Sequence, residues 1–229
     1  MFEAIIPLRS KSRGLKNKNI LLFKKRVNLV NFTIKKLIDI KKIKRIYILT
    51  DSEFYKKKII KNKKIDIKYK RISKLSKTDS KIDDLIDNFL NFYNNEKKNT
   101  KFLLFQVTSP VLRKNEILNT LKFIQSKKLS SLMHVTKVLE SPYEIIKKKK
   151  NKWSYLLGKR VVNRQNYINK YMFITGSMFF FTRNFFNKRK TIINKNTFPY
   201  EIDRLNFIDI DDKFTFELAK KVENLKTRN

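Results

Sequence analysis

The sequence of 229 residues predicts an α/β fold, in which a mostly parallel central sheet carries helices on both faces. Two observations indicate this class. Short runs rich in β-branched residues alternate with segments whose apolar residues recur at helical spacing. The run Phe102–Phe105 is apolar without interruption, as strands covered on both faces are. We find no linker long enough to separate two domains, so the sequence predicts a single domain over residues 1–229.

The first part of the chain predicts five strands separated by four helices. The expected strands are the β-branched or apolar runs Ala4–Ile6, Arg45–Leu49, Ile65–Tyr69, Phe102–Phe105 and Ser131–Val138. The expected helices carry apolar residues on one face and cover Asn28–Ile40, a segment from the cap Thr50-Asp51-Ser52 to about Ile60, Ile82–Phe92 and Asn115–Gln125. This order is typical of a doubly wound sheet, which binds ligands at the carboxyl ends of its strands.

After Pro142 the alternation becomes less regular. The segments Ile145-Ile146 and Trp153–Leu156 predict a hairpin around a lysine-rich turn. An apolar strand over Ser177–Thr182 follows a polar loop. The remaining expected elements are a strand over Asn206–Ile210 and a helix from about Phe214 to Leu225.

The composition limits the classes of protein. The net charge of +35 suggests a nucleic-acid partner, but Lys and Arg occur in nearly every segment, which argues for a solvated basic surface instead. There is no cysteine and a single histidine, His134, which we interpret as an ordinary strand residue. No apolar run reaches the roughly 18 residues that span a bilayer. The start, MFEAIIPLRS, lacks the pattern of a signal peptide, so we expect a cytoplasmic protein without membrane association.

The segment Ile5–Asn19 is the strongest motif, because a basic loop with a glycine follows the first expected strand directly. Gly14 permits the backbone to approach a ligand closely or to adopt positive φ. Backbone amides, a hydroxyl and several cations in one loop suit a triphosphate. The segment contains neither GxxxxGK[S/T] nor GxGxxG, so it is not a standard nucleotide fingerprint. The alternative is a basic solvated turn.

With further segments in order along the chain, this loop resembles the acylneuraminate cytidylyltransferases. The loop has the form IPxRxxSxG followed by KN. The other matching segments are Ile48–Ser52, Leu104–Pro110, Ser141-Pro142-Tyr143, Arg164-Gln165, Gly176 and Ile208–Asp211. The resemblance covers essentially the whole chain. It implies a Rossmann-like nucleotide-diphospho-sugar transferase fold and an enzyme that transfers CMP from CTP to an acidic sugar, releasing pyrophosphate. It also implies a homodimer, with residues of about 140–176 forming an extension that dimerises and covers the sugar.

The resemblance assigns the nucleotide half of the site. Arg9, Arg13 and Lys18 match positions that stabilise the departing pyrophosphate, and Asn19 matches one that orders the loop and contacts the nucleotide. The family usually has Lys where Arg13 stands, and this change keeps the charge. The full set of implied nucleotide-binding residues is Arg9, Ser12, Gly14, Asn19, Arg71 and Ser80.

The implied metal is Mg²⁺, held by Asp209 and Asp211. The two carboxylates lie two positions apart on an extended segment and so point to one face, about 7 Å apart. Hard oxygen ligands facing a phosphate site suit Mg²⁺, and Asp211 is also counted among the catalytic residues. The alternative is a cluster at a helix N-terminus, a role that we expect for Asp212.

The implied sugar-binding residues are Gln106, Arg164 and Phe179. Gln106 ends the central strand, where a substrate should lie, although it could instead cap Thr108-Ser109. Phe179 stands near a family Tyr and lacks its hydroxyl, so only an apolar contact is possible there. Glu144 stands where the family often has a Lys that reaches the partner subunit, and this departure puts the usual sugar geometry in doubt.

Three alternatives remain open from the sequence. The first is a CMP-Kdo-type cytidylyltransferase, although Arg13–Asn19 is unlike the SRLPGKP loop of those enzymes. The second is a catalytically inactive relative, because of Glu144 and Phe179. The third is a basic nucleic-acid-binding protein without enzymatic activity, because of the lysine content.

Overall fold

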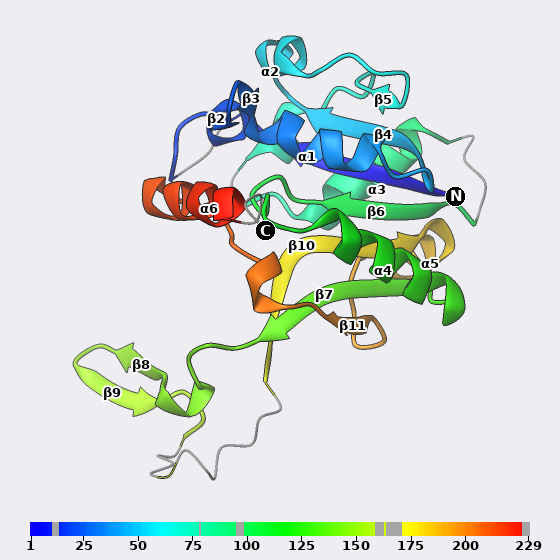
Figure 1. Ribbon diagram of the computed structural model, residues 1–229. Coiled ribbons are helices and arrows are strands. Elements are labelled where there is room, and N and C mark those ends of the chain that lie inside the picture. Colours follow the sequence, from blue (N-terminus) through cyan, green and yellow to red (C-terminus); the bar gives the residue numbers. More distant parts are fainter. Residues whose placement is uncertain (11–13, 78, 95–98, 159–162, 164–170, 226–229) are drawn as a thin grey trace.

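A central sheet of seven strands organises the computed structural model, which describes residues 1–10, 14–77, 79–94, 99–158, 163 and 171–225. The strand order is β11-β7-β10-β6-β1-β4-β5 (Figure 1). The strands are β1 (Phe2–Leu8), β4 (Ile43–Thr50), β5 (Ile65–Asp66), β6 (Lys101–Phe105), β7 (Ser131–Lys137), β10 (Met172–Thr182) and β11 (Phe198–Glu201).

The sheet is mostly parallel, as the sequence predicts. Strand β1 pairs in parallel with β4 and β6, β4 with β5, and β7 with β11. Strand β10 runs antiparallel between β6 and β7. The carboxyl ends of β1, β4 and β6 therefore meet at one edge of the sheet, where a ligand site is expected.

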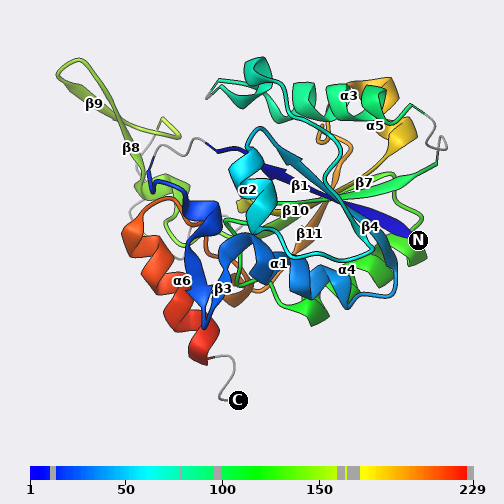
Figure 2. The ribbon, with the colours of Figure 1, turned by 90° about the horizontal axis from the view of Figure 1, so that it is seen from above.

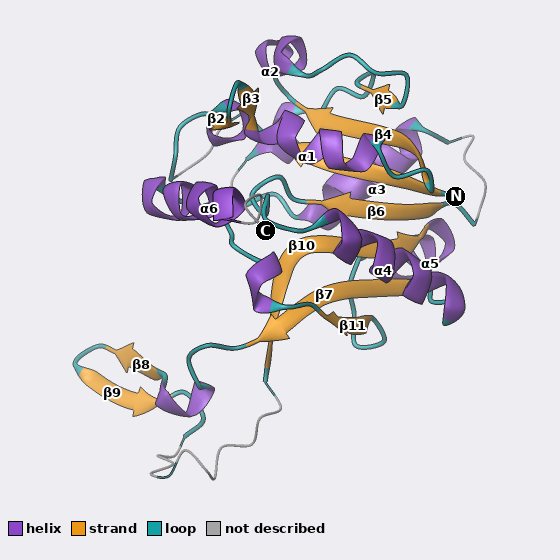
Figure 3. Cartoon of the chain, viewed as in Figure 1, coloured by secondary structure: helices purple, strands orange, loops and turns teal. Residues whose placement is uncertain are grey.

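Helices cover both faces of the sheet. Figure 2 shows α1 and α4 on one face and α3 and α5 on the other, and Figure 3 separates these helices from the strands and loops. The predicted helix over Ile82–Phe92 has the same limits in the structure as α3. The helices are α1 (Leu29–Ile38), α2 (Glu53–Lys58), α3 (Ile82–Phe92), α4 (Lys114–Ser126), α5 (Arg183–Arg189) and α6 (Lys213–Leu225).

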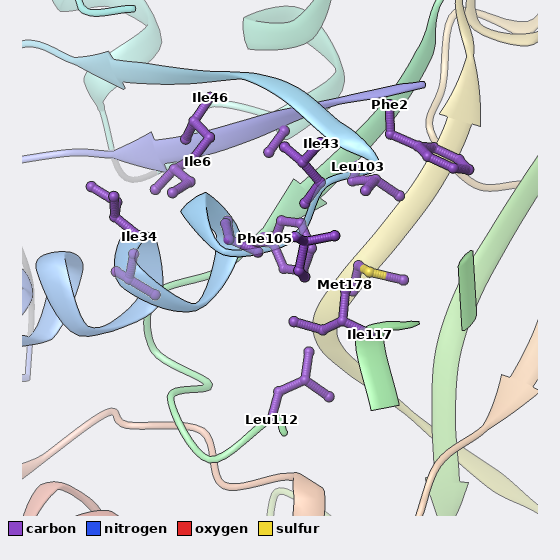
Figure 4. Packing of buried hydrophobic residues seen from close by; sticks show 14 of the residues in the cluster. Phe2, Ile6, Ile34, Ile43, Ile46, Leu103, Phe105, Leu112, Ile117 and Met178 are labelled. Carbon is purple, nitrogen blue, oxygen red and sulfur yellow. The ribbon is translucent and has the colours of Figure 1, made fainter. Parts of the chain in front are cut away.

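Side-chain alternation along β1 builds a core on each face of the sheet. Phe2 and Ile6 point to the face of α1 and α4, where they join Ile34 and Ile117 in one buried cluster (Figure 4). Ile5 points the other way and joins the cluster under α3 and α5. Both faces of β1 thus pack against buried apolar side chains, which anchors the strand that precedes the predicted phosphate loop.

A hairpin projects from this body, made of β8 (Ile146–Lys149) and β9 (Lys152–Tyr155). It lies well away from the sheet in Figure 1. Its two-residue turn contains Lys150 at φ 53°, a left-handed conformation that such hairpin turns require. The predicted hairpin around a lysine-rich turn is therefore present. A second short hairpin, β2 (Leu22–Lys24) and β3 (Val27–Asn28), precedes α1.

The structure corrects part of the predicted element order. The predicted strand over Asn206–Ile210 is wrong: a 3₁₀ turn ends at Asn206 and an extended segment without ladder partners follows. Strand β5 is shorter than predicted, and β10 begins five residues earlier than expected. Helix α5 and strand β11 were not predicted. No helix in the described part of the chain is long and apolar enough to cross a membrane.

Candidate active site

A polar cavity of about 360 Å³ opens at the carboxyl ends of β1 and β6. This is the edge of the sheet at which the sequence predicts a ligand site. The cavity walls come from the loop after β1, the segment around residue 80, the end of β6 and the segment before α6. The lining residues are Pro7, Arg9, Lys18, Asn19, Arg71, Lys77, Ser80, Ile82, Gln106, Val107, Thr108, Asp209 and Asp211.

The charges of the cavity suit a polyanionic ligand. Four cationic side chains and two carboxylates line it. The carboxylates, Asp209 and Asp211, both come from the segment before α6, whereas the cations come from two other parts of the chain, the loop after β1 and the segment between β5 and α3. A triphosphate together with a divalent cation would balance such a set, because the cations would attract phosphate oxygens and the carboxylates would bind the metal.

The loop after β1 is held by Asp51, which follows the neighbouring strand β4. Its carboxylate accepts hydrogen bonds from the Ser10 backbone N–H at 2.8 Å and from Ser10 Oγ at 3.0 Å. The amide of Asn19 donates to the Arg9 carbonyl at 3.2 Å, so the predicted ordering of the loop by Asn19 is observed. Ser52, as predicted, caps α2 by accepting from the Tyr55 N–H. The sequence analysis did not assign Asp51 to the site, because its bonds to Ser10 join residues 41 positions apart and no local pattern indicates them.

Lys18 joins this loop to the acidic segment. Its ammonium donates to the Ile210 carbonyl at 2.6 Å and lies 3.3 Å from Asp211 Oδ1. The side chain of Lys18 is mostly buried, whereas that of Asp211 is 78% exposed. Lys18 therefore has a fixed position, and Asp211 stays open to a ligand.

Asp209 and Asp211 fit a divalent cation. Asp209 Oδ1 is buried and has no hydrogen-bond partner among the described residues. Burial raises the pKa of Asp209, although a hydrogen bond from Thr108 and the charge of Lys18 oppose this effect. No cluster of three or more metal-binding side chains occurs in the described ranges, so further ligands would come from phosphate oxygens or water, as is usual for Mg²⁺. Asp212 instead caps α6, as predicted, by accepting from the Thr215 N–H at 2.8 Å.

Arg71 and Ser80 both line the cavity and come from the segment between β5 and α3. The Arg71 guanidinium is buried and donates from Nε to the Leu75 carbonyl at 2.9 Å, and Nη2 donates to the same oxygen. Burial lowers the pKa of Arg71, and the charge of Asp51 opposes this. Ser80 Oγ donates to the Lys74 carbonyl at 2.9 Å. These bonds attach both residues to the 3₁₀ turn Ser73–Ser76, and both line the cavity.

Gln106 extends from the end of β6 into the cavity. The bond that orders the next turn comes from its backbone: the Ser109 N–H donates to the Gln106 carbonyl at 3.2 Å. The turn therefore needs no cap from the Gln106 side chain, and Gln106 lines the cavity.

Phe179 was predicted to bind the sugar, and the structure does not place it in the cavity. It is paired with Leu104 in the sheet and is buried in the cluster under α3 and α5. It does not line the cavity, because the pleat directs its side chain into the core. Three other assigned residues, Ser12, Arg13 and Arg164, lie outside the described residues.

Thr108 and Lys77 line the cavity and were not among the assigned site residues. Thr108 connects two walls: its carbonyl accepts from the Ile210 N–H at 2.8 Å, and its side chain bonds Asp209. Its place in Leu104–Pro110, one of the matching segments, was a signal that it could belong to the site. Lys77 is one of many lysines and had no distinguishing signal.

Comparisons with known proteins identify the family and the fold. The family model described as "Cytidylyltransferase" matches residues 3–227. The N-acylneuraminate cytidylyltransferase of Escherichia coli O18:K1:H7 is 27% identical over 98% of this chain and 52% of its own length. The enzyme of the same name from Streptococcus agalactiae serotype V is 24% identical over 93% of this chain and 51% of its own. The chain thus spans about half the length of these curated relatives.

Solved structures share the fold at low identity. CMP:2-keto-3-deoxy-manno-octonic acid synthetase complexed with CTP has a TM-score of 0.69 at 10% identity, covering 99% of this chain and 100% of that one. The 2-C-methyl-D-erythritol 4-phosphate cytidylyltransferase of Francisella tularensis has a TM-score of 0.66 at 13% identity, covering 97% and 100%. The predicted nucleotidyltransferase fold is therefore confirmed. With the family model matching nearly its whole length, this chain belongs to the cytidylyltransferase family.

Proposed function

We propose that this chain transfers CMP from CTP to the anomeric hydroxyl of an acidic nonulosonic sugar, an acylneuraminate or a related acid, and releases pyrophosphate. The observation that carries the proposal is the single cavity that joins Arg9 and Lys18 to Asp209, Asp211 and Gln106. It offers cations for phosphate, carboxylates for a metal and an uncommitted amide for a second substrate. The named relatives at 24–27% identity support the acylneuraminate class.

In the proposed reaction the anomeric oxygen of the sugar attacks the α-phosphorus of CTP. A new oxygen–phosphorus bond forms, the bond between the α-phosphorus and the bridging oxygen to the β-phosphate breaks, and pyrophosphate leaves. Arg9 and Lys18 stabilise the charge that develops on the pyrophosphate. A nearby carboxylate takes the proton of the sugar hydroxyl. The chemistry needs charge neutralisation and positioning, and no nucleophilic side chain.

Asp209 and Asp211 are the residues that would hold Mg²⁺. When bound, the ion would neutralise charge at the α-phosphate. Lys18 fixes the segment that carries both aspartates, through its bond to the Ile210 carbonyl. Arg71 and Ser80 would contact the cytidine portion, and Gln106 would orient the sugar.

A CMP-Kdo-type reaction is the second candidate, because one solved structure of similar fold is a synthetase of that class complexed with CTP. Its 10% identity bears on the fold alone. The two candidates differ in the sugar only. Incubation with CTP, Mg²⁺ and equal amounts of N-acetylneuraminate and Kdo, followed by mass spectrometry of the products, distinguishes them. We expect the CMP-acylneuraminate; formation of CMP-Kdo alone would establish the second candidate.

We also propose that the extension around the projecting hairpin binds a second copy of this chain. Several side chains of the hairpin, of the segments next to it and of the start of β10 are both apolar and exposed. Apolar side chains gathered on one projecting segment are typical of an interface. The exposed set is Ile145, Ile146, Trp153, Leu156, Tyr171, Met172, Phe173 and Ile174.

A further inference from the structure

Strand β10 contains a large bulge beside the cavity. Its residue Ile174 pairs with Val135 of β7, but Phe179 pairs with Met133. Five steps along β10 thus correspond to two along β7, so β10 accommodates three extra residues opposite His134. A bulge of this size needs contacts that hold its shape, because the ladder bonds are interrupted there.

Buried side chains supply those contacts, with His134 at their centre. His134 Nδ1 lies 3.2 Å from Ser177 Oγ, and the His134 carbonyl accepts from Thr175 Oγ1 at 3.2 Å. Thr175 Oγ1 and Ser177 Oγ are 2.8 Å apart. On its other side, His134 Nε2 lies 3.0 Å from Thr120 Oγ1. All four residues are at most 3% exposed.

The directions of these bonds assign one tautomer to the histidine. Thr120 donates its hydroxyl proton to the Glu116 carbonyl at 2.9 Å, so its oxygen accepts from His134 Nε2–H. Nδ1 is then unprotonated and accepts from Ser177, and the Thr175 hydroxyl proton is shared between the His134 carbonyl and Ser177 Oγ. Each polar atom of the imidazole has one partner, which a buried network requires.

The bulge places Gly176 directly over the amide of Gln106. Gly176 has φ 67°, a conformation that side-chain-bearing residues rarely adopt. A β-carbon at Gly176 would lie 3.2 Å from Gln106 Oε1 and 3.5 Å from both Cδ and Nε2. Such similar distances to three atoms of one plane mean that the glycine covers the face of the amide, not its edge. Ser177 and Gln106 also line one small cavity.

We propose that His134, Thr175 and Ser177 are positioning residues: they hold the bulge of β10 so that Gly176 fixes the orientation of the Gln106 amide in the cavity. These three residues touch no substrate. Their effect on catalysis rests on the proposed function, in which Gln106 orients the sugar. Their effect on the orientation of Gln106 is independent of the proposed function.

The first test measures Gln106 directly, without any substrate. The chain has three glutamines, Gln106, Gln125 and Gln165, so ¹⁵N labelling of glutamine side chains gives three pairs of amide signals. A Gln106→Glu variant identifies the pair of Gln106 by its loss. Ser177→Ala and Gly176→Ala should each shift this pair and leave the signals of Gln125 unchanged.

Two matched variants separate positioning from general damage. Ser131→Ala also removes a buried hydroxyl from a sheet strand, where Ser131 Oγ donates to Thr197 Oγ1 at 3.3 Å. Gly158→Ala imposes a similar backbone strain, since φ is 78°, but no atom of the described residues lies within 4 Å of the new β-carbon. Neither control should shift the Gln106 pair. Equal shifts in a control, or none in Ser177→Ala and Gly176→Ala, would overturn the proposal.

The second test separates the sugar from the nucleotide. In pyrophosphate-release kinetics, Ser177→Ala should raise the KM for the sugar acid about fivefold or more and change the KM for CTP less than about twofold. Ser131→Ala should change neither KM by more than about twofold. A shifted Gln106 signal with an unchanged sugar KM would overturn the catalytic consequence. If wild-type protein turns over no sugar acid, the proposed function fails, and the NMR result still decides whether the network positions Gln106.

Discussion

The α-carbon of Gly14 packs against the backbone of Asp211. A β-carbon on Gly14 would lie 2.1 Å from the Asp211 carbonyl oxygen, far inside van der Waals contact. The loop after β1 and the acidic segment therefore meet backbone to backbone, 197 positions apart in the chain. The sequence predicted that Gly14 lets the backbone approach a ligand closely; in this structure the close approach is to the segment that carries the candidate metal ligands, and Gly14 does not line the cavity.

Gly14→Ala should therefore reduce activity more than stability. The new methyl group must push the loop away from Asp211, which separates the phosphate side of the cavity from the acidic side. We expect kcat/KM to fall at least about tenfold, equivalent to about 1.4 kcal/mol. Because Gly14 is exposed, the melting temperature should stay within a few degrees of wild type. A variant with full activity would show that this contact has no role.

Asp209→Asn should remove metal binding, whereas Asp212→Asn should not. The two residues lie three positions apart, but Asp209 lines the cavity and Asp212 caps α6. We expect Asp209→Asn to lower kcat about 100-fold. Asp212→Asn should cost about 1 kcal/mol of stability or less and keep activity. Mn²⁺ binding followed by electron paramagnetic resonance provides a readout independent of turnover. Equal Mn²⁺ affinity in Asp209→Asn and wild type would rule out the metal site.

Lys18→Met should lower kcat/KM for CTP, because Lys18 supplies positive charge to the cavity and holds the Ile210 carbonyl. We expect kcat/KM for CTP to fall about tenfold or more, as for the loss of a charged hydrogen bond. Lys16→Met is the matched control, since Lys16 is an exposed turn residue two positions away that does not line the cavity. Steady-state kinetics at fixed ionic strength give the comparison. Similar losses in both variants would point to nonspecific charge instead.

The stability of the fold should depend on pH through His134. Burial lowers its pKa from 6.5 to about 3. Between these values the unfolded chain binds a proton that the folded chain does not, so acidification favours unfolding. From pH 6 to pH 5 this residue should lower the free energy of unfolding by about 1 kcal/mol.

Urea unfolding of wild type and His134→Gln at both pH values measures this effect. His134 is the only histidine, so the variant removes all histidine titration. We expect the wild type to lose about 1 kcal/mol more than the variant over this interval. Equal losses would show that His134 has an ordinary pKa and is not buried in the neutral form.

Trp153→Glu should disrupt the proposed homodimer. Trp153 lies on the projecting hairpin with 60% of its surface exposed, so the substitution should not unfold the monomer. Light scattering of wild type should give about twice the chain mass of 27.7 kDa, and the variant should give the monomer. A monomeric wild type with full activity would contradict the proposed interface.

Much of the fold could be predicted from local patterns. Helix α3 has its predicted limits because five apolar residues mark one face and polar residues bound it. The strand predicted over residues 206–210 is absent for a physical reason. The apolar residues Phe207 and Ile210 of this segment are buried, and an extended segment achieves this burial against the core without a strand partner. Strand β11 contains a proline and lies at the sheet edge, so its sequence has a weak strand signal.

The candidate site was less predictable where contacts are distant in sequence. Arg9, Lys18, Asn19 and Asp211 could be assigned because they belong to short motifs. The clamp from Asp51 to Ser10 and the cover of Gln106 by Gly176 depend on strand order and on the bulge in β10. Phe179 was wrongly placed because one residue of register decides whether a strand side chain faces a ligand or the core.

The measurement that tests the proposed function most directly is pyrophosphate release from CTP with a panel of nonulosonic acids and Mg²⁺. We predict release that requires CTP, at least one acid of the panel and Mg²⁺ together, and that falls about 100-fold in Asp209→Asn. Absence of release by wild-type protein with every acid, or equal release by Asp209→Asn, would contradict the proposed function.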